Sequence, residues 1–237
     1  MKLVTNIFGS SLGKKYVMAI TGLAMFGFVI AHLIGNLQFF LGPESINRYG
    51  HFLQSNIEVI WPARIFLLAM IGLHIWSAIK LSAENKAARP TPYANWNPTA
   101  ASYASRTMLM SGLIVFAFIV FHLLHYTVMV KAVNLTGHDF KASPEFYDLE
   151  GRHDIFKMMV NGFHNPWVSL FYIVGIGLLC LHLSHGVSAM FSSLGLKNYT
   201  YAPTLDKGAK IIAWLIFLGY ISIPISVMCG YGKGALL

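Results

Sequence analysis

The chain has 237 residues, of which 56% are hydrophobic and only 11% charged, too little charge to cover the surface of a soluble domain of this size. Its net charge of +8 does not indicate nucleic-acid binding, because no basic patch is interleaved with aromatic residues on a soluble surface. The two cysteines form neither a CxxC nor a CxxCH pattern, which excludes a zinc knuckle and a covalently attached cofactor.

Five long apolar segments dominate the sequence. A run of about 18 or more residues with few charges predicts a membrane-spanning helix, since in lipid each backbone amide must be bonded within its own segment. The predicted spans cover residues 16–41, 61–80, 107–130, 166–192 and 210–230. We therefore expect an all-α membrane protein with five transmembrane helices that form a single domain over residues 1–237 and contact lipid.

The first span follows three lysines, Lys2, Lys14 and Lys15, as the apolar part of a secretory signal does. The run from Tyr16 is too long for a signal, and no small-x-small cleavage site ends it, so we expect a retained helix. The longest loop, 131–166, is too small for an independent domain. A soluble substrate pocket within this chain is therefore not expected.

The loops on the two sides of the predicted helices differ in charge. The N-terminal segment and the loops 80–106 and 197–210 contain ten basic and two acidic residues, whereas the other side contains seven of each. Cytoplasmic loops of membrane proteins are enriched in Lys and Arg. We therefore expect the N-terminus in the cytoplasm and the C-terminus outside.

Histidines within the predicted spans are the main functional signal. The first four helices each contain at least one and the fifth contains none; the set is His32, His74, His122, His125, His182 and His185. An ionisable residue at membrane depth is costly and indicates a functional site. One such histidine is equally well explained by a hydrogen bond to a neighbouring helix, but four helices that each carry one favour a shared ligand.

Depth along the helices groups these histidines. His32 lies 17 residues past Lys15 and His122 lies 16 residues past Arg106, which places both about 24–25 Å from the cytoplasmic edge. His125 lies one turn further out and matches His32 less well. His32 and His122 are therefore expected to form an outer pair.

The second and fourth helices run in the opposite direction. His74 lies six residues before Lys80 and His182 lies 16 residues past Pro166, so both fall in the inner half of the membrane. Depth alone does not separate His182 from His185. We expect an inner pair between His74 and one of these two histidines.

Two imidazoles on opposite faces of a porphyrin saturate its iron, which suits reversible one-electron transfer. The two pairs therefore predict two haems, one in each leaflet of a layer about 30 Å thick. A hydroxyl residue and a glycine precede a histidine at the same spacing twice, in Thr21-Gly22…His32 and Ser111-Gly112…His122. Eleven residues make three helical turns, so Thr21 and Ser111 would face the inner haem and leave room for a flat ring, with close helix packing as the alternative.

With these residues in place, the chain resembles the five-helix, di-haem cytochrome b subunits that anchor bacterial succinate dehydrogenases and fumarate reductases. The likeness covers nearly the whole chain. It rests on the His74 helix and four short motifs: Ala31-His32-Leu33-Ile34-Gly35-Asn36, Phe121-His122-Leu123-Leu124-His125, Phe163-His164-Asn165-Pro166-Trp167 and His182-Leu183-Ser184-His185-Gly186.

The resemblance implies that the first four helices form a haem-binding bundle with axial ligands His32 and His122 for the outer iron and His74 and His182 for the inner iron. It favours His182 over His185 as the ligand, because members of the family keep the spacing from ligand to glycines that His182, Gly186 and Gly195 show here. It also implies two b haems, a quinone that is usually menaquinone, and flavoprotein and iron–sulfur subunits on the cytoplasmic side of a bacterial inner membrane. Succinate would react in those partners, and quinone at this chain.

The sequence does not assign a single role to several other polar residues. His125 and His185 would bond haem propionates or only pack, and Arg64 at a helix start would pair with a propionate. Candidates near the expected quinone end are Glu44, Asn47, Arg48 and Glu58, for which solvated loop positions are the favoured interpretation. His153 and His164 are expected to have surface or capping roles.

Two other functions remain as alternatives. The chain would be a di-haem anchor of another respiratory complex, such as a formate dehydrogenase or hydrogenase. Otherwise it would be a haem-free transporter that uses its histidines as a proton relay, a class typified by broken helices and inverted repeats.

Overall fold

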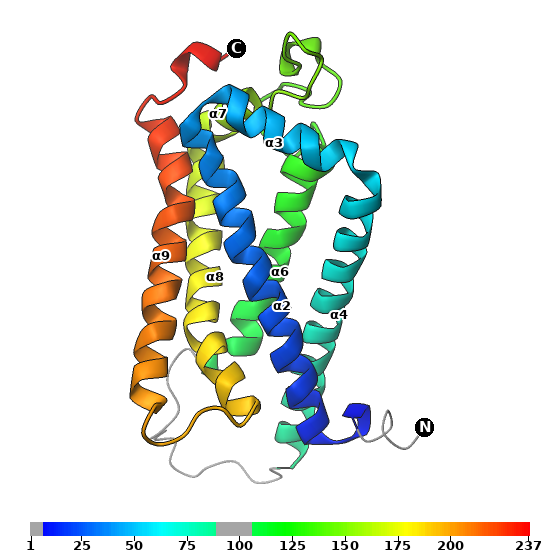
Figure 1. The fold of residues 1–237 in the computed structure, drawn as a ribbon, viewed down its shortest axis with the longest axis vertical. Helices are drawn as coiled ribbons and strands as arrows, with labels where there is room; N and C mark the ends of the chain where they lie inside the picture. Colours follow the sequence, from blue (N-terminus) through cyan, green and yellow to red (C-terminus); the bar gives the residue numbers. More distant parts are fainter. Residues whose placement is uncertain (1–6, 89–105) are drawn as a thin grey trace. The chain divides into compact units, whose positions relative to one another are not determined.

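The computed structural model describes residues 7–88 and 106–237, and no strand occurs among them (Figure 1). Five helices are long and apolar enough to cross a membrane, which confirms the predicted all-α membrane fold. They are α2 (Ser11–Leu37) with the short helix η1 (Gln38–Leu41), α4 (Ile57–Ala87), α6 (Met108–His122) with the π-helical turn η2 (Leu123–Thr127), α8 (Pro166–Ser193) and α9 (Ala202–Met228). Two basic residues of the predicted cytoplasmic loops, Lys2 and Arg89, lie outside the described residues.

The helices extend beyond the apolar runs that predicted them. Helix α4 begins at Ile57 and not near residue 61, so Pro62 lies inside the helix, in its second turn. Helix α9 begins at Ala202, eight residues before the predicted span. An apolar run marks the part of a helix that suits lipid, whereas the backbone continues into polar turns.

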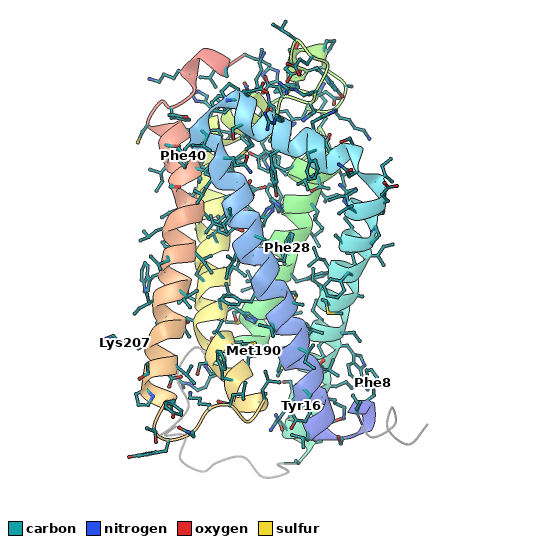
Figure 2. The ribbon with its side chains drawn as sticks, viewed as in Figure 1. Phe8, Tyr16, Phe28, Phe40, Met190 and Lys207 are labelled. Carbon is teal, nitrogen blue, oxygen red and sulfur yellow. The ribbon has the colours of Figure 1, made fainter. Side chains whose placement is uncertain are left out.

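Large apolar side chains project outward along the long helices. Tyr16, Phe28 and Phe40 are exposed, as Figure 2 illustrates. The same holds for a larger set that includes Ile20, Leu23, Leu68, Trp214, Leu215 and Leu218. An apolar surface of this kind is not stable in water, so these faces contact lipid in a multi-pass membrane protein.

The chain divides into two compact units, and each long helix contributes a segment to both. The first unit comprises residues 1–29, 64–113 and 180–213, and the second comprises residues 30–63, 114–179 and 214–237. His74, His182 and His185 belong to the first unit, whereas His32, His122 and His125 belong to the second.

Two lysines of the first unit form ion pairs. The Lys14 side chain is 5% exposed, and its Nζ donates to the Gly9 carbonyl at 2.9 Å and contacts Glu84 Oε1 at 2.7 Å. Lys197 Nζ lies 2.6 Å from Asp206 Oδ1, and Ser188 donates to the same carboxylate. A buried ammonium without a partner is strongly destabilising, so the Lys14 pair fixes the start of α2 against the end of α4.

The second unit includes a cap of short helices and aromatic residues. Its elements are α3 (Pro43–Ser55), η3 (Pro144–Phe146), α7 (Ile155–His164) and η4 (Lys233–Ala235). Phe39 is fully buried and stacks on Phe156 with ring centroids 4.8 Å apart, while Phe140 and Phe146 are buried against Met158. The loop 131–166 is therefore largely folded, with its own apolar core.

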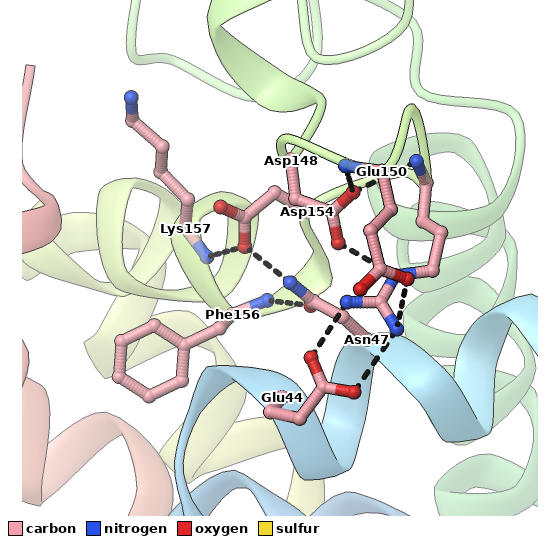
Figure 3. A network of polar contacts seen from close by, with 8 residues as sticks. Glu44, Asn47, Asp148, Glu150, Asp154, Phe156 and Lys157 are labelled. Carbon is pink, nitrogen blue, oxygen red and sulfur yellow. Dashed lines mark hydrogen bonds and ion pairs between the residues drawn. The ribbon is translucent and has the colours of Figure 1, made fainter.

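Asn47 connects α3 to α7 (Figure 3). Its Nδ2 donates to Asp154 Oδ1 at 3.0 Å, and its Oδ1 accepts from the Phe156 amide at 3.0 Å. Asp154 in turn caps α7 by accepting from the Lys157 amide. Asn47 is 2% exposed, so this candidate from the expected quinone end is a buried structural residue and not a solvated one.

Substituting Asn47 by alanine is expected to loosen the start of α7, because the Phe156 amide and the Asp154 carboxylate both lose a partner. Each buried group left unpaired costs roughly 1–3 kcal/mol, so we expect about 10- to 100-fold faster exchange of the first α7 amides by hydrogen–deuterium exchange. Asn56→Ala is the matched control, since the Asn56 side chain donates to the Phe52 carbonyl at the end of α3 and makes no described contact with α7. Equal exchange in both variants would contradict this role.

Arg152 attaches the loop to α3. Its guanidinium lies 2.6 Å from Glu44 Oε2 and 2.7 Å from Asp148 Oδ2. The hydrogen bond from Arg152 lowers the pKa of Glu44 from its ordinary value. The contribution to stability is therefore complete above the ordinary glutamate pKa, about 4.3, and is lost as the pH falls through the lowered pKa.

On acidification through this range we expect the loop to separate from α3. The separation can be followed by the distance between spin labels at the exposed positions Phe52 and Leu149, in a background where the exposed Cys229 is replaced by serine. Glu44→Gln should show the wider distance distribution at all pH values. A distribution that stays narrow to the lowest pH in both proteins would exclude this attachment.

Candidate functional site

In the first unit, His74 on α4 and His182 on α8 face one another. Their ring centroids are 6.4 Å apart and the ring planes are inclined by 65°. His74 Nδ1 lies 3.1 Å from the Met18 carbonyl oxygen and 3.1 Å from Thr21 Oγ1, both on α2. The imidazole is thus held by a neighbouring helix through one nitrogen only.

These contacts fix which nitrogen of His74 carries the proton. A carbonyl oxygen can only accept, so Nδ1 must be the donor to Met18. The Thr21 hydroxyl donates its own proton to the Val17 carbonyl at 2.7 Å, which leaves its oxygen to accept from the same imidazole. A neutral His74 therefore keeps a free lone pair on Nε2, the nitrogen that a metal would bind.

His182 shows the same arrangement with another helix. Its Nδ1 lies 3.3 Å from Ser111 Oγ on α6, and the Ser111 hydroxyl donates to the Met108 carbonyl at 3.1 Å. With its proton in the bond to Met108, the Ser111 hydroxyl accepts from Nδ1 of His182. His182 then keeps its lone pair on Nε2. Thr21 and Ser111, which the sequence predicted to make room for a flat ring, each hold an imidazole.

The glycines that follow these hydroxyl residues allow the close approach. A Cβ at Gly22 would lie 3.4 Å from His74 Cε1, and a Cβ at Gly112 would lie 3.2 Å from His182 Cε1. The first distance is a close van der Waals contact, and the second is shorter than about nine in ten real Cβ contacts. A side chain at Gly112 would therefore push the His182 ring away from Ser111.

In the second unit, His32 on α2 and His122 at the end of α6 form the other pair. Their ring centroids are 5.8 Å apart and the planes are inclined by 80°. His122 Nδ1 lies 3.3 Å from the Tyr172 hydroxyl on α8. The ring of His32 also lies near that of Tyr220, with centroids 6.2 Å apart.

His125 lies in the π-helical turn that follows His122. It is fully buried, it stacks on Tyr126 with centroids 3.9 Å apart, and its Nδ1 lies 3.0 Å from the Tyr172 hydroxyl. Within the described residues, His125 Nε2 and the Tyr126 hydroxyl are buried side-chain polar atoms without a hydrogen-bond partner. Turns of this kind often occur at functional sites.

Tyr172 was not singled out from the sequence, although it is the only tyrosine of α8, ten residues before His182. A single tyrosine within an apolar span is the signal that could have drawn attention to it.

The other predicted residues are His185, Arg64 and the two loop histidines. His185 is half-buried on α8, in electrostatic range of Lys197 and Asp206. Arg64 is exposed on α4 and belongs to the first unit, whereas His32 and His122 belong to the second. The two loop histidines sit in the cap, where His153 Nε2 donates to the Phe140 carbonyl at 2.8 Å and His164 ends α7.

Both pairs have the spacing of axial ligands. Two metal–imidazole bonds of about 2 Å each, plus the ring radii, place the centres of two opposed imidazoles about 6 Å apart. Within residues 7–88 and 106–237, no group of three or more His, Cys, Asp or Glu residues could hold a metal ion. Two opposed imidazoles are the protein ligands of a bis-histidine haem, whose macrocycle supplies the other ligands of the iron.

Comparison of the chain with known protein families, with curated proteins and with solved structures finds no match. The paired imidazoles are therefore identified as a candidate site from the geometry of this chain alone.

Proposed function

We propose that the chain is a cytochrome b that holds two haems, one between His74 and His182 and one between His32 and His122. The observation that carries the proposal is the pairing itself: ring centroids 6.4 and 5.8 Å apart, close to the spacing of two opposed axial ligands. The hydrogen bonds of Nδ1 in His74 and His182 add to it, because they keep Nε2 available for iron.

When bound, such a haem supplies reversible one-electron transfer and, with both axial positions taken, no open site for oxygen. The role of this chain is to keep four imidazoles neutral, oriented and shielded from water. Thr21, Ser111 and the Met18 carbonyl orient the ligands of the first unit, and Tyr172 contacts His122 in the second.

We further propose that this cytochrome is the membrane anchor of a succinate:quinone oxidoreductase. The resemblance of its histidine motifs to the di-haem anchors of succinate dehydrogenases and fumarate reductases supports this assignment. Electrons would pass between an iron–sulfur subunit and a membrane quinone, expected to be menaquinone, while succinate reacts in a flavoprotein partner. This chain would thus take part in quinone oxidoreduction and not in succinate chemistry.

The proposed location is a bacterial inner membrane with the N-terminus in the cytoplasm. The excess of basic residues in the N-terminal segment and in the loops 80–106 and 197–210 supports this orientation. The same positive surface would suit the docking of the two soluble subunits.

The test is to purify the complex from membranes and count its haems by pyridine haemochrome spectroscopy. We expect two b haems per chain. The steep angles of 65° and 80° between the paired rings lead us to expect strongly anisotropic low-spin signals in electron paramagnetic resonance. One haem or none would overturn the ligand assignment.

The subunits that copurify discriminate among the remaining functions. A flavin-bearing subunit supports the succinate:quinone assignment, whereas a molybdenum- or nickel-bearing subunit would identify a formate dehydrogenase or hydrogenase. A colourless protein with proton-coupled transport would support the transporter alternative.

A further inference from the structure

We propose that Tyr172 is a positioning residue that couples the tautomer of His122 to that of His125 through one hydroxyl. The inference rests on the proposed function, because it follows from iron bound at His122. It assigns linked roles to two residues of the second unit, Tyr172 and His125, that do not themselves contact iron.

Tyr172 is placed to join the two histidines. It is 4% exposed, and its hydroxyl lies 3.3 Å from His122 Nδ1 and 3.0 Å from His125 Nδ1. The two histidines are three residues apart, and His125 lies in the π-helical turn that follows His122. The Nδ1 atoms of both histidines therefore contact the same hydroxyl on α8.

A phenol has one proton to donate and can accept others, which limits the arrangements. If His122 gives the lone pair of Nε2 to iron, its proton is on Nδ1 and is donated to the Tyr172 oxygen. The Tyr172 proton is then free to be donated to His125 Nδ1. A neutral His125 that accepts at Nδ1 must carry its own proton on Nε2.

Without iron at His122 the chain of bonds can run in the opposite direction. His125 then donates from Nδ1 to Tyr172, which donates to His122 Nδ1, and the proton of His122 sits on Nε2. Iron at His122 excludes this second arrangement, because a protonated Nε2 cannot be a ligand. The two arrangements differ at His125 Nε2, which lacks a partner among the described residues.

The ligands of the first unit have no such link. The hydroxyls that accept from His74 and His182 donate to the carbonyls of Val17 and Met108, so those bonds end on the backbone. Of the three ligands whose Nδ1 contacts are described, His74, His122 and His182, His122 is the one joined through that contact to a second, fully buried histidine. One haem is therefore expected to respond to changes at Tyr172, and the other is not.

The direct test is nitrogen NMR of histidine-labelled protein in the haem-loaded complex. We expect His122 to be protonated at Nδ1 and His125 at Nε2, and we expect His125 to change tautomer when haem is removed. Protonation of His125 at Nδ1 in the loaded complex would overturn the proposal, whatever the variants below show.

The second test compares Tyr172→Phe with Tyr126→Phe in the full complex, at unchanged haem content. Loss of the acceptor should weaken the electron donation of His122, so in Tyr172→Phe we expect one midpoint potential to rise and one resonance signal to move. Tyr126→Phe removes a neighbouring buried hydroxyl that has no partner in the described structure, and it should leave both haems unchanged.

Failure of this inference and failure of the proposed function give different results. Two haems with no shift in Tyr172→Phe, or an equal shift in Tyr126→Phe, would refute this inference and leave the proposed function standing. Absence of haem from the wild-type complex would refute the proposed function itself. His125→Phe added to Tyr172→Phe should shift the potential no further, since the two residues act through one hydroxyl.

Discussion

Replacing His182 or His74 by alanine is expected to reduce the haem content of the complex from two per chain to one. Their rings face one another at 6.4 Å, and each keeps Nε2 available while Nδ1 is bonded to a neighbouring helix. Loss of either imidazole leaves one axial ligand, which is not sufficient for a six-coordinate, low-spin iron. Pyridine haemochrome quantitation and the disappearance of one low-spin signal measure the result.

Smaller changes around the same pair should give graded effects. Thr21→Val and Ser111→Ala remove only the hydroxyl that accepts from Nδ1, and loss of such a partner typically costs 10- to 100-fold in metal affinity. We expect Ser111→Ala to weaken haem retention more, since His74 Nδ1 also bonds the Met18 carbonyl, whereas the described contact of His182 Nδ1 is with Ser111 alone.

The matched control for His182→Ala is His185→Ala on the same helix. His185 lies one turn further along α8, and its electrostatic neighbours are Lys197 and Asp206. Both haems should remain in this variant. Loss of the haem from His185→Ala, with His182→Ala unaffected, would reverse the choice that depth alone left open.

The elements of this fold could be predicted from hydropathy, and the ends of the helices could not. Lipid demands apolar side chains and internally bonded backbone, so the five runs identified five helices. The polar turns beyond the runs carry no such signal. Hence α4 begins at Ile57 and reaches Ala87, beyond the predicted 61–80, and α9 starts eight residues early.

The candidate histidines could be found because ionisable groups are rare at membrane depth, and helix rise was enough to group them. Their hydrogen bonds depend on contacts between helices, which spacing along one helix does not determine. Spacing placed Thr21 and Ser111 correctly at the level of the inner pair, but the bonds to His74 and His182 appear only in the structure.

Tyr172 and His125 were harder to place because their partners lie on other elements. A regular helix would keep His125 on roughly the face of His122, one turn along. At the π-helical turn Leu123–Thr127 both histidines contact the Tyr172 hydroxyl, and His125 lies fully buried among Tyr126, Phe140 and Tyr172. Spacing along one helix predicts the shared face but not the residues of α8 and of the loop that surround it.

The same relation between helices occurs twice in the first unit. A hydroxyl on α2 bonds a histidine of the next long helix, α4, and a hydroxyl on α6 bonds a histidine of the next long helix, α8. In both cases a glycine follows the hydroxyl residue and meets the histidine ring. In both helix pairs a hydroxyl residue followed by a glycine thus orients a histidine of the next long helix. This shared arrangement explains why Thr21-Gly22 and Ser111-Gly112 occur at the same distance from His32 and His122.

Replacing His122 by alanine is expected to remove the second haem, and replacing His125 is expected to retain both. His122 faces His32 at 5.8 Å, whereas His125 stacks on Tyr126 and reaches Tyr172 through Nδ1. His32→Ala should cause the same loss as His122→Ala, and the double variant should lose nothing more, since one missing ligand already empties the pair. Haem content and the low-spin signals of the purified complex measure this.

The His122 and His125 variants can be compared only if the substitution at His125 preserves the packing around it. His125 is fully buried, so alanine would leave a cavity among aromatic rings, and truncation of a buried aromatic ring typically costs about 3–5 kcal/mol. His125→Phe keeps the ring and its stacking on Tyr126 but removes both nitrogens. If His125→Phe loses a haem while His122→Phe keeps two, then His125 is the ligand, because both variants preserve the packing and differ only in which imidazole is removed.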